Sequence, residues 1–403
     1  MSEAARFLPY GRQAVDDDDV AAVVATLGSD FLTMGPATQA FEKEFARVTG
    51  ARFAVSCSSG TAALHLAAIA LGLGPGDAVV VPAVTFLATA NAARFVGAEV
   101  VFADVDADSG LMGPEHLTAT LERGGRSVKA VFPVHLAGQS PDMPQIAAIA
   151  RARGLAVVED ACHALGSAYR RNGTDTTVGS CADSLLAAFS FHPVKTVAMG
   201  EGGAVTTNDE ALAKRLRTTR SHGVIRDDAA FKNRDLACAA DGEVNPWYYE
   251  MHDLGFNYRA SDLHCALGLS QLGKLDAFAR RRRALARRYD ELLAPLAPVV
   301  RPIAKTPGGR PVWHLYVVLI DFEKAGVSRG RLMKRLRDKR IGSQVHFIPV
   351  HHQPYYRERY GDLALPGADR YYARCLTLPL FPAMADEDVA RVADALGEAL
   401  RAG

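Results

Sequence analysis

Short apolar runs alternate with helical segments through the first half of the chain. Strands are predicted for residues 54–56, 78–81, 99–102, 128–132 and 155–158. Helices are predicted between them for residues 61–71, 85–95, 114–121 and 141–152. This order is typical of an α/β protein with a mostly parallel sheet covered by helices on both faces. Ligands in open sheets of this kind bind at the carboxyl ends of the strands, so we expect the chemistry in the loops that follow them.

The second half of the chain predicts a smaller α/β unit. A long helix over residues 261–293 is predicted to connect it to the first half. The unit itself is predicted from the segments 312–320, 331–339, 343–347 and 386–401. We therefore expect a large domain over residues 1–270 and a small C-terminal domain over residues 271–403.

Composition narrows the class of protein. The chain has 403 residues, of which 49% are hydrophobic and 23% charged, so it can build a large core and is long enough for two domains. With a net charge of +1, the protein lacks the strong positive electrostatic field of proteins that bind nucleic acids or membrane surfaces. The arginines at 280–283, 287 and 288 are therefore interpreted as a solvated helix face. No nucleic-acid or membrane partner is expected.

Cysteine and histidine spacing gives further exclusions. The six cysteines are scattered without a Cys-x-x-Cys pair, which predicts reduced thiols and a cytoplasmic location. The most apolar stretch, residues 78–102, is interrupted by polar residues and is not a membrane span. His346, His351 and His352 surround Pro349, which prevents one helix from presenting them together, so no metal site is expected.

Two loops after predicted strands have a candidate binding role. Ser59, Gly60 and Thr61 open an apolar helix, where exposed amides and hydroxyls would hold a phosphate; an ordinary serine or threonine cap is the alternative. Phe86 follows the next strand, and would be either a core residue or a plate on which a flat ligand stacks.

Two further segments carry an acid and an amine. Glu159 and Asp160 end a buried strand, with His163 three residues beyond Asp160; a capping acid and a core histidine are the alternative interpretation. The strand-like run 185–191 ends at a His-Pro turn, and Lys195 follows before a glycine-rich stretch. By itself this lysine would equally be a solvated residue in a hairpin.

Together these segments specify a chemistry. A phosphate cradle, an aromatic plate, an acid at a strand end and a lysine on a later strand are the parts needed to hold pyridoxal 5'-phosphate (PLP). The lysine would attach covalently to the aldehyde, and the acid would pair with the ring nitrogen. The sequence shows no Walker-type loop and no zinc-ligand spacing.

The motifs resemble those of the DegT/StrS family of nucleotide-sugar aminotransferases. The similar segments are Ser190–Lys195, Gly200–Gly203, Ser59–Thr61, Glu159–Gly166 and Gly255–Arg259, in the family's order and over nearly the whole chain. The resemblance implies a PLP-dependent transferase of fold type I, with a large domain and a smaller C-terminal α/β domain.

The resemblance also implies roles for single residues. Lys195 would be the catalytic lysine that carries the cofactor and moves the proton. The other residues implied to bind the cofactor are Ser59, Gly60, Thr61, Phe86, Asp160, His163, Ser190 and, from the neighbouring subunit of a homodimer, Asn257. Candidate sugar-nucleotide contacts are Trp313, His314, Tyr316 and His346.

Within the family, the resemblance is closest to enzymes that aminate a sugar for pseudaminic acid. It implies transfer from L-glutamate, leaving 2-oxoglutarate, to the 4-keto group of a UDP-linked 4-keto-6-deoxy-N-acetylhexosamine. Another nucleotide keto-sugar, amination at the 3-position, and a PLP-dependent sugar dehydratase are the alternatives. The long polar stretch 225–250 would be either a lid or a loop that covers the dimer partner.

Overall fold

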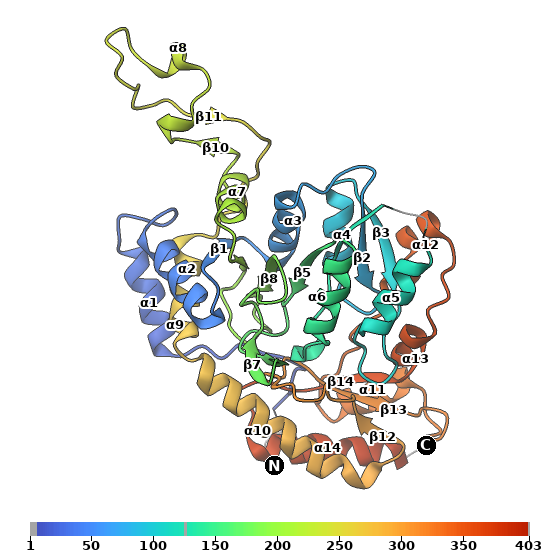
Figure 1. Cartoon of the computed structure of the whole chain (residues 1–403). Coiled ribbons are helices and arrows are strands. Elements are labelled where there is room, and N and C mark those ends of the chain that lie inside the picture. The colour runs from blue at the N-terminus through green and yellow to red at the C-terminus, as the bar shows by residue number, and fades with distance from the viewer. Residues whose placement is uncertain (1–5, 125–126, 402–403) are drawn as a thin grey trace.

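A seven-stranded sheet forms the centre of the protein (Figure 1). The computed structural model describes residues 6–124 and 127–401. The strands are β1 (Phe53–Cys57), β2 (Ala78–Pro82), β3 (Glu99–Ala103), β4 (Val128–Val131), β5 (Ala156–Asp160), β8 (Leu186–Ser190) and β9 (Gly203–Thr207). Their order is β1-β9-β8-β5-β4-β2-β3, and β9 alone among them runs antiparallel to its neighbours. The predicted mostly parallel α/β sheet is confirmed.

Helices cover both faces of this sheet. They are α1 (Asp17–Leu27), α2 (Pro36–Thr49), α3 (Gly60–Ala70), α4 (Leu87–Phe95), α5 (Pro114–Glu122), α6 (Met143–Ala152) and α7 (Glu210–Arg220). Every residue of β2 is buried, as expected for a strand with helices on both sides. α3 is apolar around most of its circumference because it packs against the sheet while α4 and α7 also contact it.

The C-terminal unit is built on a three-stranded antiparallel sheet. Its strands are β12 (Val300–Pro302), β13 (Tyr316–Ile320) and β14 (Cys375–Leu378). The helices of this half are α10 (Leu275–Leu293), α11 (Arg329–Asp338), α12 (Pro354–Tyr360), α13 (Pro366–Arg374) and α14 (Asp386–Arg401). Leu8 near the N-terminus joins this unit, because its amide donates to Arg340 O over 3.0 Å and its carbonyl accepts from Gly342 N over 2.7 Å.

The single helix predicted over residues 261–293 is wrong. The structure has two helices, α9 (Asp262–Leu272) and α10, with a break at Gly273 and Lys274. Lys274 leaves the helical path at this break, and its Nζ lies 2.9 Å from Asp19 Oδ1 of α1. The break therefore coincides with a contact between α1 and the α9–α10 connection.

The solvated face predicted for the arginine run is wrong at Arg282. This side chain is completely buried, and its Nη1 donates to the carbonyls of Trp313, His314 and Leu380 over 3.1–3.3 Å. Burial lowers its pKa to about 10. Helix α10 packs Arg282 against segments whose carbonyls are not paired in a strand. The helical periodicity of the sequence does not reveal this contact, because it does not show what the helix packs against.

An arm of about thirty residues projects from the body of the protein (Figure 1). It contains the short strands β10 (Val224–Ile225) and β11 (Glu250–Met251) and the helix α8 (Arg234–Ala237). Inside the arm, the rings of Phe231 and Tyr248 meet edge to face at 4.9 Å. A hairpin of β6 (Ala168–Arg171) and β7 (Thr174–Thr177) lies elsewhere, beside the sheet. Among the described residues, no helix combines the length and the apolar composition needed to cross a membrane.

Candidate active site

A cavity of about 590 Å³ lies beside the carboxyl ends of β5 and β8. The structure brings ten of the residues singled out from the sequence to its wall. They are Ser59, Gly60, Thr61, Phe86, Asp160, His163, Ser190, Lys195, His314 and His346. The loops after β1, β2, β5 and β8 meet here because parallel strands end at one edge of the sheet. No residue of the arm between positions 225 and 250 lines this cavity of its own chain.

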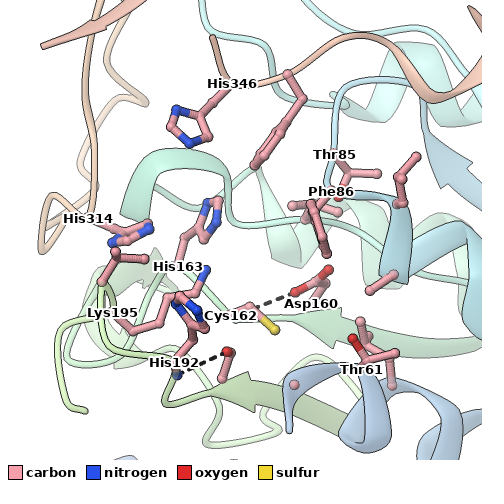
Figure 2. Close-up of a pocket in the computed structure, with 18 of the residues that line it drawn as sticks. Thr61, Thr85, Phe86, Asp160, Cys162, His163, His192, Lys195, His314 and His346 are labelled. Carbon is pink, nitrogen blue, oxygen red and sulfur yellow. Dashed lines mark hydrogen bonds between the residues drawn. The ribbon is translucent and has the colours of Figure 1, made fainter. Parts of the chain in front are cut away.

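Asp160 is fixed at the end of β5 by two hydrogen bonds. Its Oδ2 accepts from Thr89 Oγ1 over 2.6 Å. Its Oδ1 accepts from Cys162 N over 3.1 Å (Figure 2). The neighbouring Glu159 lies on the opposite face of the strand, where it contacts His135 at 3.0 Å. Successive side chains of a strand point to opposite faces, so only Asp160 of these two acids faces the cavity.

Thr89 was missed by the sequence analysis as a site residue. It lies in the first turn of α4, fully buried, and its hydroxyl is also 2.7 Å from that of Thr85. Because the Thr89 proton faces the Asp160 carboxylate, Thr85 donates in turn to Thr89. The sequence does show a threonine near the start of an apolar helix that follows a strand. It does not show the hydrogen-bond partner of this threonine, because Asp160 is 71 residues away.

Lys195 lies in a tight turn after β8. Its amide donates to His192 O over 2.8 Å, and Gly200 then takes a positive φ of 78° that allows the chain to return as β9. Figure 2 shows the Lys195 side chain reaching into the pocket near His163 and His314. Burial lowers the pKa of the Lys195 amine, while Cys162 and Asp160 oppose that shift.

The start of α3 packs very closely against β8. A Cβ added to Gly60 would lie 2.6 Å from Ser190 Cβ, so only glycine fits at this position. Ser59 caps the helix by accepting from Ala62 N over 3.1 Å, and Thr61 lies beside the cavity in Figure 2. Backbone amides and hydroxyls therefore gather at the positive end of a helix, which suits a phosphate.

Three histidines form the wall opposite this helix. The ring centroids of His163 and His314 are 4.5 Å apart, and His346 Nδ1 lies 2.8 Å from Thr377 Oγ1. Burial, together with the charge of Lys195, lowers the pKa of His346 to about 3 and lowers the pKa values of the other two as well. The rings are neutral at pH 7. Nδ1 of His163 and of His314 is buried without a hydrogen-bond partner among the described residues.

Three residues singled out from the sequence do not line the cavity. Trp313 lines a separate cavity of about 290 Å³ together with arginines of α10. Tyr316 packs on Tyr289 with ring centroids 4.5 Å apart, and its hydroxyl donates to Asp290 over 2.8 Å. Asn257 is exposed at the base of the arm, outside the cavity of its own chain.

The residues present fit PLP. The start of α3, where only glycine fits at position 60, suits a phosphate group. The carboxylate of Asp160 is held in place to pair with a pyridine nitrogen, and Lys195 supplies an amine of lowered pKa. With the large, mostly parallel sheet and the smaller C-terminal unit, this site defines a PLP-dependent aminotransferase of fold type I.

The chain belongs to the DegT/DnrJ/EryC1/StrS aminotransferase family, whose model matches residues 13–397. It is similar to the spore coat polysaccharide biosynthesis protein SpsC of Bacillus subtilis (strain 168), with 42% identity over 398 residues, or 98% of this chain and 97% of SpsC.

Two solved structures show the same fold over the whole length. Helicobacter pylori PseC, an aminotransferase involved in pseudaminic acid biosynthesis, superposes with a TM-score of 0.87 at 25% identity, covering 99% of this chain and 100% of PseC. DesI, solved in the presence of its TDP-sugar product, superposes with a TM-score of 0.84 at 31% identity, covering 99% of this chain and 94% of DesI.

Proposed function

We propose that the protein transfers an amino group from L-glutamate to the 4-keto group of a UDP-linked 4-keto-6-deoxy-N-acetylhexosamine. The product would be UDP-4-amino-4,6-dideoxy-N-acetyl-β-L-altrosamine, a precursor of pseudaminic acid. The observation that carries the proposed amino transfer is the position of Lys195 and Asp160 on the wall of one cavity. The similarity to PseC and to DesI supports a nucleotide-linked sugar as the acceptor.

Each residue of the site has a part in this proposal. PLP, when bound, links to amines through its aldehyde and withdraws electrons from the carbon that bears the amine. Ser59, Gly60, Thr61 and Ser190 would hold its phosphate, and Asp160 would accept a hydrogen bond from its ring nitrogen. Phe86 and His163 would contact the ring.

Lys195 has two functions in the proposal. It carries the cofactor between turnovers, and its Nζ then moves a proton at the carbon that gains or loses nitrogen. A lysine must be deprotonated to accept that proton, and the burial that lowers the pKa of Lys195 increases the deprotonated fraction at neutral pH.

The proposed active site is shared between two copies of the chain. Large apolar side chains are exposed on α1 and the segment after it, namely Val20, Val24, Leu27, Phe31 and Met34. Trp247 of the arm is 73% exposed. A contact between two copies would bury such surfaces. Asn257 at the base of the arm would then reach the phosphate in the partner's cavity.

The test is turnover of a panel of keto sugars. Purified protein with L-glutamate is offered UDP-, TDP- and GDP-linked 4-keto and 3-keto sugars, and the aminated carbon is located by NMR. We expect turnover of the UDP-4-keto-6-deoxy-N-acetylhexosamine and a loss of at least about a hundredfold in Lys195→Ala. Wild-type turnover in that variant would disprove the assignment of Lys195.

Two other outcomes distinguish the alternatives. Preference for a different nucleotide or for a 3-keto sugar would keep the aminotransferase and change its substrate. A product that lacks nitrogen would indicate the sugar dehydratase, in which relatives carry a histidine where this chain has Lys195.

A further inference from the structure

Two histidines and an aspartate cluster outside the active-site cavity, where the 3-10 turn η4 (Val350–His352) meets α13. One ligand atom each from His351, His352 and Asp369 lies within 4.8 Å of the others. Nε2 of His352 is 2.6 Å from Asp369 Oδ1, and Nε2 of His351 is 3.8 Å from the same oxygen. The two rings have centroids 4.0 Å apart.

His351 has no hydrogen-bond partner for either ring nitrogen among the described residues, although it is only 2% exposed. Leaving a buried polar group unpaired destabilises the folded protein. A neutral imidazole has one nitrogen that accepts. With the ring proton on Nδ1, that nitrogen is Nε2 of His351, which lies close to the Asp369 carboxylate, itself an acceptor. A cation between these atoms would satisfy both acceptors.

We propose that His351, His352 and Asp369 form a divalent metal site that suits Zn²⁺. Imidazole nitrogen and carboxylate oxygen bind this ion at about 2.0–2.2 Å, and three protein ligands leave one position for water. The side chains of His352 and Asp369 are 38% and 46% exposed, so an ion can enter from solvent and these two ligands can rotate onto it.

The sequence predicted no metal site, and that prediction considered only the three histidines. Pro349 does prevent one helix from presenting all three histidines, and His346 lies instead in the active-site wall. The third ligand is Asp369, which comes from a different helix 17 residues beyond His352. Its place is fixed by Asp104, whose carboxylate accepts from Gly367 N over 2.9 Å and Ala368 N over 2.8 Å at the start of α13.

The site would stabilise a loop that lines the active-site cavity. His346 and Phe347 line that cavity a few residues before η4, and Val350 N donates to Ala83 O over 2.8 Å, just before the segment with Phe86. An ion that joins η4 to α13 would hold this loop in place. Its function would be structural, because none of its three ligands lines the cavity.

The test uses tag-free protein loaded with PLP, treated with a chelator and then dialysed. Zn²⁺ is titrated by calorimetry, bound metal is counted by mass spectrometry, and the site is examined by the absorption spectrum of Co²⁺. We expect one ion per chain and a higher thermal midpoint with Zn²⁺. In Asp369→Asn and His351→Asn we expect an affinity at least about tenfold weaker.

Two matched variants make the result decisive. His264→Asn removes a histidine on α9, and should bind Zn²⁺ as the wild type does. His346→Asn removes a histidine of the active-site wall and should also keep the ion. The proposal would be overturned if the wild type bound no Zn²⁺ or bound it with only millimolar affinity. It would also be overturned if Asp369→Asn bound Zn²⁺ as tightly as the wild type, or if only His346→Asn lost binding. Because Asp369 is exposed, Asp369→Asn tests the site even where His351→Asn fails to fold.

Discussion

The hydroxyl of Thr89 decides how Asp160 is presented to the cavity. A hydrogen bond to a charged group contributes about 1.5–3 kcal/mol. Thr89→Val keeps the shape of the side chain and removes the 2.6 Å bond to Oδ2. We therefore expect kcat to fall by about ten- to a hundredfold with the fold intact, measured by steady-state kinetics and circular dichroism.

Thr120→Val is the control for this substitution. Thr120 is also a buried helical threonine, its hydroxyl donates to His116 O over 2.7 Å, and it does not line the cavity. Its kcat should stay at the wild-type value. An equal loss of kcat in both variants would show that Thr89 affects catalysis only by stabilising the fold.

His346 makes the stability of the protein depend on pH. Its pKa is about 3 in the folded protein against about 6.5 in an unfolded chain, so the unfolded state binds the extra proton between these values. The free energy of unfolding should therefore fall as the pH drops below 6.5, by about 2 kcal/mol at pH 5 for this group. Denaturant unfolding at pH 7 and pH 5 measures the loss, and His346→Asn should reduce it by that amount. The same loss in the variant would contradict the assigned shift.

At the scale of elements, α10 is joined to the active-site wall through Arg282. This guanidinium donates to the carbonyls of Trp313 and His314, which precede β13. Arg282→Leu would leave these carbonyls unpaired in a buried place, so we expect the free energy of unfolding to fall by roughly 3 kcal/mol. KM for the sugar should rise because His314 lines the cavity.

Arg280→Leu provides the comparison on the same helix. Arg280 is exposed, and its loss should change stability by less than about 0.5 kcal/mol. Chemical denaturation of both variants checks the difference. Similar values for the two would mean that the carbonyl bonds of Arg282 contribute little.

At the scale of the whole molecule, the proposed shared site predicts complementation between two inactive chains. Lys195→Ala and Asn257→Ala would each lose activity alone. In a mixed dimer, one cavity would combine the intact Lys195 of one copy with the intact Asn257 of the other. Co-expression in equal amounts should therefore restore about a quarter of the wild-type activity, since half the dimers are mixed. Activity no higher than that of the separate variants, with dimers present in sedimentation, would place Asn257 outside the partner's site.

The order of strands and helices follows from the sequence because it depends on local periodicity. The run 78–81 is buried from both sides, and its apolar composition shows this directly. The run 99–102 is an edge strand that buries Val100 and Phe102 and leaves Glu99 and Val101 partly exposed. Because parallel strands end at one edge, the loops with Ser59, Asp160 and Lys195 could be predicted to meet. The PLP chemistry of the family follows from these residue types and their order.

The tertiary structure decided which side chains of the irregular segments face the cavity. Trp313 and His314 are adjacent, yet only His314 lines it, because Trp313 lies in a separate cavity with arginines of α10. Thr89 and Arg282 find their partners far along the chain, and the ligands proposed for the metal come from two different elements. Such contacts depend on packing between distant segments, which no local pattern records, whereas the sheet and its lysine depend on patterns only a few residues long.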